Sequence, residues 1–204
     1  MNTTIAIIDD DPSVLDSLGL LLKQEGFQVH PFLDAESFLN GQDKEEIIIS
    51  DVRMPNMSGI ELLHRLHDKK SFQPVILLTG HGDIEMAVTA MKLGAYDFIE
   101  KPYSKEKILH SLKSALDHTR KKNITQGNLS ELQQRYDALT DRQKETMKLL
   151  TEGFSNKEIA NELHISPRTV EIHRTLVMER MKAESLSQLI RMGIDLKILK
   201  ISEK

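Results

Sequence analysis

Carboxylates, a hydroxyl and an amine follow separate short apolar runs in the N-terminal part of this sequence. Asp9, Asp10 and Asp11 follow the run at residues 5–8, Asp51 ends the run from 47, Thr79 ends the run from 75, and Lys101 follows Phe98 and Ile99. Carboxylates that face one another repel strongly unless a cation lies among them, and Mg²⁺ suits such a place because it binds few carboxylates and keeps several waters. A carboxylate nucleophile, a metal, an ammonium group and a hydroxyl donor together predict phosphoryl transfer to an aspartate.

Each of these residues also has a purely structural interpretation. An aspartate at a strand end is usually a turn or capping residue, and Asp11, which precedes Pro12, is expected to cap the first helix. Lys101 and Pro102 could simply form a loop. Taken singly, each structural interpretation is preferred, but the joint pattern, with one polar residue after each of several strands, favours a functional site.

Five short apolar runs alternate with five helical patterns over the first 120 residues. The expected strands are Thr4–Asp9, Phe27–Pro31, Glu46–Asp51, Pro74–Thr79 and Tyr96–Glu100. The expected helices are Ser13–Glu25, Asp34–Leu39, Gly59–His67, Ile84–Leu93 and Lys105–His118. The second strand is the most polar and is expected near an edge. The pattern predicts an α/β fold with a doubly wound, five-stranded parallel sheet, whose working site lies outside the carboxyl ends of the strands.

The remaining chain is polar and then wholly helical in pattern. Residues 119–137 are expected to form a linker that is partly helical from Ser130. The expected starts of the later helices are Thr140, Ser155, Ser166 and Ser185, and Gly153 stands where a helix should stop. Four helices with short connections predict a small all-α domain.

Composition limits the function classes further. The 204 residues include no cysteine, which excludes disulfides and thiol-based metal sites. The N-terminus lacks the pattern of a signal peptide, and no apolar stretch approaches the roughly 18 residues of a membrane span, so a soluble, cytoplasmic protein is expected. Residues 1–120 carry 12 Lys and Arg against 19 Asp and Glu, whereas residues 141–204 carry 12 against 10, which indicates two parts with different roles.

Residues from about 3 to 119 resemble the receiver domain of bacterial response regulators. The resemblance rests on IIDDD, SDVRMPNMSGIELL, LLTGHGD and GAYDFIEKP, which occur in the family's order and spacing. It implies that Asp51 is the phosphoacceptor and that Mg²⁺ is held by Asp9, Asp10, Asp51 and the backbone carbonyl of Arg53. It also implies that Thr79 and Lys101 contact the phosphoryl group, that Phe98 is an aromatic switch, that Lys101–Pro102 is a cis peptide, and that Met54, Pro55 and Gly59 shape the loop after Asp51.

A second signal lies in the helix expected from Ser166 to Lys182. Its apolar residues Val170, Leu176, Val177 and Met181 recur near helical spacing and predict a buried face. The opposite face carries Arg168, Thr169, Glu171, His173, Arg174 and Arg180, which suits a helix that reads the major groove of DNA. From composition alone, a solvated helical bundle fits about as well, because the net positive charge is small.

Three segments resemble the LuxR-type helix-turn-helix: LTDRQ, EGFSNKEIANEL and ISPRTVEIHR. The sequence SPRTVEIHR is most similar to the FixJ-like branch of this family. The resemblance implies a scaffold helix at Ser155–Leu163 and a recognition helix at Ser166–Lys182. The expected DNA-contacting residues are Ser155, Asn156, Lys157, Arg168, Thr169, Glu171, His173 and Arg174. Glu171 could accept a hydrogen bond from cytosine or could orient a neighbouring arginine, and the sequence does not choose between these roles.

These observations predict a receiver domain at residues 1–119, a linker at 120–137 and a helix-turn-helix domain at 138–204. The expected function is a two-component transcription factor whose Asp51 is phosphorylated by a sensor histidine kinase, with a homodimer, double-stranded DNA and RNA polymerase as partners and no membrane. One alternative is that the helical domain binds RNA or a protein. Another is a Mg²⁺-dependent phosphatase, although Arg53 stands where such an enzyme would need a general acid. No enzymatic turnover is expected.

Overall fold

The computed structural model of the chain describes residues 3–41, 45–69, 71, 73–80, 84–121 and 125–199. The chain forms two compact units. The first comprises residues 1–82 and 93–120, and the second comprises residues 83–92 and 121–204.

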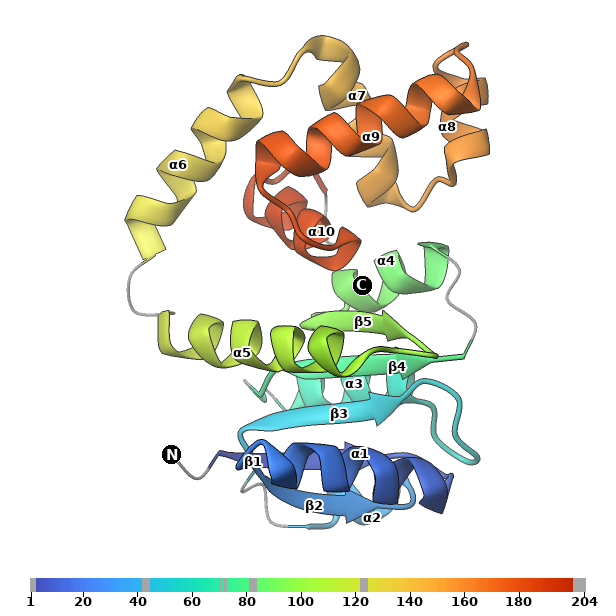
Figure 1. Ribbon diagram of the computed structural model, residues 1–204, viewed down its shortest axis with the longest axis vertical. Helices are drawn as coiled ribbons and strands as arrows, with labels where there is room; N and C mark the ends of the chain where they lie inside the picture. Colours follow the sequence, from blue (N-terminus) through green and yellow to red (C-terminus); the bar gives the residue numbers. More distant parts are fainter. Residues whose placement is uncertain are drawn as a thin grey trace. The chain divides into compact units, whose positions relative to one another are not determined.

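The first unit is built on a five-stranded sheet in which every pairing is parallel. Its strands are β1 (Thr4–Ile8), β2 (Gln28–Phe32), β3 (Ile47–Asp51), β4 (Val75–Thr79) and β5 (Asp97–Glu100). Their order across the sheet is β2-β1-β3-β4-β5 (Figure 1). The predicted α/β fold is confirmed, and each strand begins and ends within one residue of the predicted first and last residues. The most polar strand, β2, lies at an edge as predicted.

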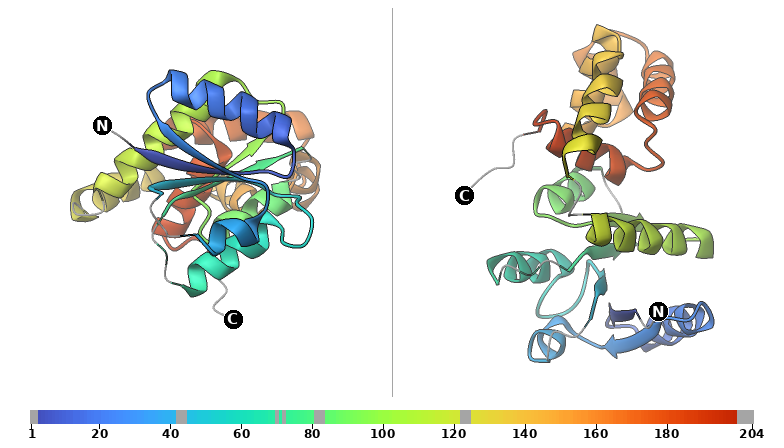
Figure 2. Two further views of the ribbon diagram at one scale, coloured as in Figure 1. Left: turned by 90° about the horizontal axis from the view of Figure 1, so that it is seen from below. Right: turned by 90° about the vertical axis from the view of Figure 1, so that its left-hand side faces the viewer.

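Helices cover both faces of this sheet. They are α1 (Pro12–Gln24), α2 (Ala35–Leu39), α3 (Gly59–Asp68) and α5 (Lys105–Lys121), while α4 (Ile84–Lys92) follows β4 in the chain. The left view of Figure 2 shows α1 and α5 on one side of the sheet and α2 and α3 on the other. Alternate strand residues such as Ile5, Ile7 and Ile49 pack against α1 and α5 in one apolar core. Burial on both faces explains why β1, β3 and β4 are continuous apolar runs.

Local capping explains where several of these helices begin. The Asp11 side chain accepts a hydrogen bond from the Ser13 amide, so the expected capping role of Asp11 is confirmed. Asp34 caps α2 in the same manner. Ser58 and Glu61 form a reciprocal capping box at the start of α3, directly after the loop that follows Asp51.

The second unit contains a helical core. Its later helices are α6 (Thr125–Asp137), α7 (Asp141–Glu152), α8 (Asn156–Glu162), α9 (Pro167–Met181) and α10 (Leu186–Asp195). The predicted starts at Thr140, Ser155, Ser166 and Ser185 are all N-cap residues. Gly153 ends α7 with a φ of 105°, a left-handed conformation that glycine adopts without a side-chain clash.

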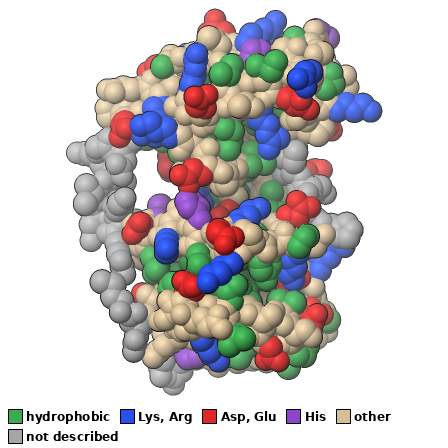
Figure 3. Space-filling view, viewed as in Figure 1, with side chains coloured by type: hydrophobic (Ala, Val, Ile, Leu, Met, Phe, Trp, Pro, Cys, Tyr) green, Lys and Arg blue, Asp and Glu red, His purple; other side chains and the backbone are tan. Residues whose placement is uncertain are grey.

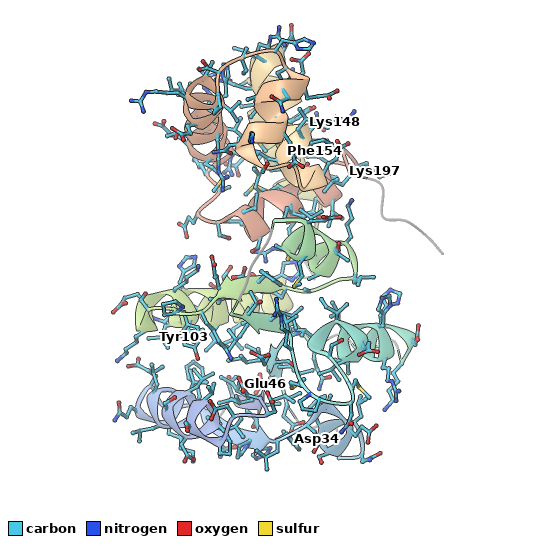
Figure 4. The ribbon with its side chains drawn as sticks, turned by 90° about the vertical axis from the view of Figure 1, so that its right-hand side faces the viewer. Asp34, Glu46, Tyr103, Lys148, Phe154 and Lys197 are labelled. Carbon is cyan, nitrogen blue, oxygen red and sulfur yellow. The ribbon has the colours of Figure 1, made fainter. Side chains whose placement is uncertain are left out.

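Apolar side chains from α7, α8, α9 and α10 meet in this core. Met147, Ile159, Val170, Val177 and Leu189 are fully buried there. Phe154, which joins α7 to α8, packs against the same cluster (Figure 4). Of the four residues predicted to face inward on α9, Val170, Val177 and Met181 are buried, whereas Leu176 is only half-buried and lies outside this core.

Helix α6 occupies most of the predicted linker and begins at Thr125 rather than at Ser130. Its Leu132 is buried in the same core as Val177 and Met181. Arg135 on α6 donates hydrogen bonds to the Met181 carbonyl at the end of α9 and to the carboxylate of Glu131. The C-terminal half of α6 thus packs as part of the helical unit.

Candidate functional site

The polar residues singled out in the first unit lie at one edge of its sheet. Asp9 follows β1, Asp51 ends β3, Thr79 ends β4 and Lys101 follows β5. These four strands are neighbours in the sheet, and Asp51 pairs in register with Leu78, the residue before Thr79. Since parallel strands place their carboxyl ends on the same edge, the topology gathers the four residues there.

Lys101 joins two of the carboxylates. Its Nζ lies 2.8 Å from Asp9 Oδ2 and 2.5 Å from Asp51 Oδ1. The carboxylates are almost inaccessible, with Asp9 2% and Asp51 7% exposed. The shared ammonium therefore compensates two negative charges that would otherwise repel each other in a poorly solvated place.

The second oxygen of each carboxylate accepts a backbone hydrogen bond. Asp51 Oδ2 accepts from the Arg53 amide at 2.6 Å, and Asp9 Oδ1 accepts from the Asp11 amide at 3.0 Å. These bonds fix the orientation of both carboxylates before any ligand arrives. Preorganised groups of this kind favour a reaction because they need not reorganise when charge develops.

The remaining predicted residues lie around this centre in different environments. Thr79 is buried, and its carbonyl accepts a hydrogen bond from the Lys101 amide at 2.6 Å. Phe98 is half-buried on β5, whereas Asp10 is exposed beside Asp9. The Lys101–Pro102 peptide bond is cis, in agreement with the resemblance.

Gly59 is fitted closely against the backbone of Asp51. A Cβ atom at Gly59 would lie 2.3 Å from the Asp51 carbonyl oxygen, a distance that real Cβ atoms do not show. The Gly59 amide donates a hydrogen bond to the Val52 carbonyl at 3.0 Å. Any other residue at this position would displace the strand end that carries Asp51, which explains why the loop needs a glycine here.

The site shifts the ionisation of Lys101. Burial by itself lowers the pKa of this ammonium, but hydrogen bonds to Asp51 and Asp9 and the charges of these carboxylates outweigh it, so that the pKa lies above the ordinary value of 10.5. Lys101 therefore remains a cation at neutral pH and holds the two carboxylates together.

Tyr103 is a neighbour of the site that the sequence reasoning missed. It lies in the segment that joins β5 to α5 (Figure 4), and burial raises the pKa of its phenol above 10.0 while the charge of Lys101 acts in the opposite direction. The signal available in the sequence was its position, two residues after Lys101 and directly after Pro102. The charges of Asp9 and Asp51 also act on this phenol, which places Tyr103 close to the charged cluster.

The donor atoms fit a hard divalent cation. Asp9 and Asp51 bring carboxylate oxygens to one place, and each carboxylate has lone pairs beyond those used by Lys101 and the backbone amides. Asp10 and the Arg53 carbonyl belong to the adjoining loops and supply further oxygen, the ligand type that Mg²⁺ prefers. Within the described ranges, no cluster of three or more His, Cys, Asp or Glu side chains forms a metal cage by itself.

The second candidate site lies on α8 and α9 of the helical unit. The Ser155 hydroxyl accepts from the Glu158 amide and the Glu158 carboxylate accepts from the Ser155 amide, which fixes the start of α8. Arg174 Nη1 donates to Asn156 Oδ1 at 3.3 Å and so links α9 to the start of α8. Lys157 is exposed. The start of α8 thus presents amides and a cation together, as at many phosphate-binding helix ends.

The predicted contact residues of α9 differ in their exposure. Arg168 and Glu171 are exposed, whereas Thr169, His173 and Arg174 are half-buried. The Thr169 hydroxyl is paired with Ser166 at the helix cap. His173 Nδ1 is buried and has no hydrogen-bond partner among the described residues. On α9, Arg168 and Glu171 are therefore the predicted contact residues that are most accessible to a ligand.

Charge alone does not mark this surface. On the face shown in Figure 3, acidic and basic side chains are interspersed over both units. No helix in the described part of the chain is both long enough and apolar enough to cross a lipid bilayer.

Comparison with known proteins relates both sites to characterised domains. Residues 5–113 match the response regulator receiver domain, and residues 137–193 match the luxR family of bacterial regulatory proteins. Both carboxylates, Thr79 and Lys101 fall in the first match, and α8 and α9 fall in the second.

Single relatives match nearly the whole chain. The transcriptional regulatory protein FixJ of Rhizobium meliloti (strain 1021) is 42% identical over 193 residues, which cover 94% of this chain and 95% of the relative. The response regulator protein TmoT of Ectopseudomonas mendocina is 40% identical, with 96% of this chain and 90% of the relative covered. A crystal structure of full-length FixJ from B. japonicum has 41% identity and a TM-score of 0.57, and covers 97% of this chain and 98% of that one.

Proposed function

Because the chain belongs to the two-component response regulators, with a receiver domain and a LuxR-type DNA-binding domain, we propose that phosphorylation of Asp51 controls its binding to DNA. The observation that carries the proposal is the shared ion pair, in which Lys101 Nζ contacts both Asp51 Oδ1 and Asp9 Oδ2. Such a cluster holds one carboxylate in a fixed orientation beside a permanent cation. A fixed carboxylate and a cation are what an aspartyl phosphate requires.

In the proposed reaction a carboxylate oxygen of Asp51 attacks the phosphorus of a phosphohistidine on the cognate sensor kinase. An O–P bond forms, the N–P bond of the donor breaks, and the released imidazole takes up a proton. Lys101 compensates negative charge on the transferred group, and the hydroxyl of Thr79 donates a hydrogen bond to it. Mg²⁺, held by Asp9, Asp10, Asp51 and the Arg53 carbonyl, would neutralise further charge on the phosphoryl oxygens.

The new phosphoryl group then changes the balance of contacts around Lys101. Its charge competes with Asp9 and Asp51 for the ammonium and draws the Thr79 hydroxyl towards the phosphoryl oxygens. Phe98, half-buried on the neighbouring strand, moves into the space that Thr79 leaves. We expect this local change to bias a two-state surface that extends over residues 84–113.

The expected output is a homodimer that binds a two-fold DNA site. The contact residues proposed for the helix-turn-helix are Ser155, Asn156, Lys157, Arg168, Thr169, Glu171, His173 and Arg174. Half-sites about one helical turn apart match a two-fold dimer. We place the domain limits at 1–119, 120–137 and 138–204, and expect contact with RNA polymerase, a cytoplasmic location beside the DNA, and no turnover of free phosphoesters.

The decisive experiment compares Asp51→Asn with the wild type in binding to random DNA duplexes, with and without Mg²⁺ and a small-molecule phosphodonor. The wild type should bind an enriched two-fold sequence more tightly when both additives are present, and Asp51→Asn should not respond. Asp68→Asn, a change at an exposed carboxylate at the end of α3, is the matched control and should respond as the wild type does. A full phosphodonor response of Asp51→Asn would refute the assignment, and binding to RNA alone would replace DNA as the ligand.

A further inference from the structure

Burial divides the recognition helix α9 into two faces. Val170, Val177 and Met181 are fully buried and fix the inward face. The opposite face includes the exposed residues Arg168, Glu171, Ile172 and Thr175, which lie at helical spacing, and Glu179 continues this face towards the end of the helix. A helix presents residues three and four apart on one side, so these residues form a continuous outward stripe.

Ile172 is the unexpected member of this stripe. It is 55% exposed, although it is large and wholly apolar. A β-branched residue is also a weaker helix former than alanine or leucine, so neither packing within the unit nor helix propensity accounts for it. An exposed apolar side chain at the centre of a ligand-binding helix gains free energy only when a partner covers it.

Thr175 extends the apolar surface beside Ile172. Its hydroxyl bonds to the Glu171 carbonyl at 2.9 Å, so its donor group is used within the helix. This bond fixes the side-chain rotamer and leaves the methyl group as the part available to a partner. Ile172 and Thr175 are three residues apart and therefore present adjacent methyl groups.

The charges around this patch indicate base edges rather than the phosphate backbone. Glu171 is exposed next to Ile172, and a carboxylate repels phosphates but accepts hydrogen bonds from the amino groups of bases. Arg168, one turn earlier, can donate to guanine or to a phosphate. A face with a carboxylate and an apolar centre therefore suits the floor of the major groove. Thymine is the base that offers an apolar group there, its C5-methyl.

We propose that Ile172 packs against the C5-methyl group of a thymine in the DNA site and so determines specificity at that position. The inference rests on the proposed binding of DNA by α9 and adds a residue to it. The contacts expected from the sequence do not include Ile172, because they are all polar or charged side chains.

The test removes the thymine C5-methyl group and the apolar end of the Ile172 side chain separately. Full-length phosphorylated protein is first used to select its preferred duplex from a random pool. Each thymine of that duplex is then replaced in turn by uracil, which lacks only the C5-methyl group, and affinities are measured for the wild type and for Ile172→Ala. Leu129→Ala, a change at an apolar residue of α6 that is 47% exposed, is the matched control.

One thymine per half-site should be sensitive in the wild type, with about fourfold weaker binding on replacement by uracil, the equivalent of ~0.8 kcal/mol for one buried methyl. Ile172→Ala should bind thymine and uracil duplexes equally at that position, while Leu129→Ala keeps the wild-type difference. Ile172→Val should retain most of it. Circular dichroism should show unchanged helix content, because the site is exposed and alanine favours helices.

Two outcomes would overturn the inference while leaving the DNA-binding function in place. One is that Ile172→Ala keeps the full uracil effect, and the other is that no thymine of the selected site is sensitive in the wild type. If the wild type selects no duplex at all, the proposed function itself fails. Loss of dimerisation in Ile172→Ala with an unchanged uracil effect would assign this patch to a second copy of the chain.

Discussion

Replacing Lys101 by methionine should destabilise the first unit substantially. The change keeps an unbranched side chain of similar length and removes the ammonium that lies 2.8 Å from Asp9 and 2.5 Å from Asp51. Asp9 and Asp51 would then face each other with no cation between them, in positions that are 2% and 7% exposed. The expected loss comes from two broken ionic hydrogen bonds and from the repulsion that they offset.

The magnitude follows from these contacts. A hydrogen bond to a charged group contributes about 1.5–3 kcal/mol, and removing one partner of a fully buried ion pair costs about 3–5 kcal/mol. The Lys101 side chain is 25% exposed, so water can replace part of the ammonium's solvation of the carboxylates. We therefore expect the free energy of unfolding to fall by about 3 kcal/mol, at the lower end of that range.

The assay is urea unfolding of the full-length protein at neutral pH with a chelator, followed by far-ultraviolet circular dichroism. For a slope of about 2 kcal/mol per molar urea, the midpoint of the first unit should fall by about 1.5 M. Hydrogen exchange of β1 and β3 assigns the loss to that unit. Millimolar Mg²⁺ should restore part of the stability, because a bound cation compensates the same carboxylates.

Lys105→Met is the matched control. Lys105 forms an ion pair with Glu25 at 2.6 Å, but this pair lies at the surface, where water screens the charges, so its loss should change the stability little. If Lys101→Met unfolded at the same urea concentration as Lys105→Met, the shared ion pair would not stabilise the site, and the reasoning from burial and charge would be wrong.

Three further predictions concern pH, a helix cap and the link between α6 and α9. The pKa values of Lys101 and Tyr103 in the folded protein lie above their ordinary values of 10.5 and 10.0. The contribution of these two groups to stability is therefore complete at pH values below the ordinary pKa values, and it is lost as the pH rises through the pKa values of the folded protein. Circular dichroism from about pH 9 to 12 should therefore show a shallower alkaline loss in Lys101→Met combined with Tyr103→Phe, and an unchanged slope would contradict the assignment. Ser155→Ala should lower stability by about 1 kcal/mol in thermal unfolding because it removes the cap of α8, whereas Ser155→Asp should keep the stability and weaken DNA binding, since it places a carboxylate near phosphates. Arg135→Ala should speed hydrogen exchange in the last turn of α9, because it removes the hydrogen bonds to the Met181 carbonyl and to Glu131. Arg135→Lys should restore part of the protection. Equal exchange in the wild type and both variants would show that α6 does not hold that turn.

Much of the fold could be predicted from the sequence because its signals are local. Strands β1, β3 and β4 are apolar runs rich in β-branched residues, and several helices start after side chains such as Ser58, Ser155 and Ser166, which accept hydrogen bonds from amides in the first helical turn. The gathering of Asp9, Asp51, Thr79 and Lys101 could also be predicted, since parallel strands must place their carboxyl ends on one edge. These inferences need only hydrophobic periodicity, capping chemistry and topology.

Other features were decided by packing between segments far apart in the sequence. Lys101 lies between two carboxylates, and Gly59 lies so close to the Asp51 carbonyl that no side chain would fit. Both arrangements depend on how closely loops that are distant in the sequence approach one another. The extent of α6 depends on the burial of Leu132 in a core formed by later helices. Local propensity in a polar segment is too weak to set such a boundary.

The recognition helix α9 shows most clearly the difference between what a local pattern predicts and what packing between distant segments decides. The residue pattern predicts a helix from Ser166 to Lys182 with one apolar face, and it assigns His173 and Arg174 to the opposite face. The tertiary structure turned both of these partly inward and left Ile172 exposed. The rotation of a helix about its axis is set by the side chains it packs against, and these come from other helices, so a one-dimensional pattern fixes that rotation only to within about one residue.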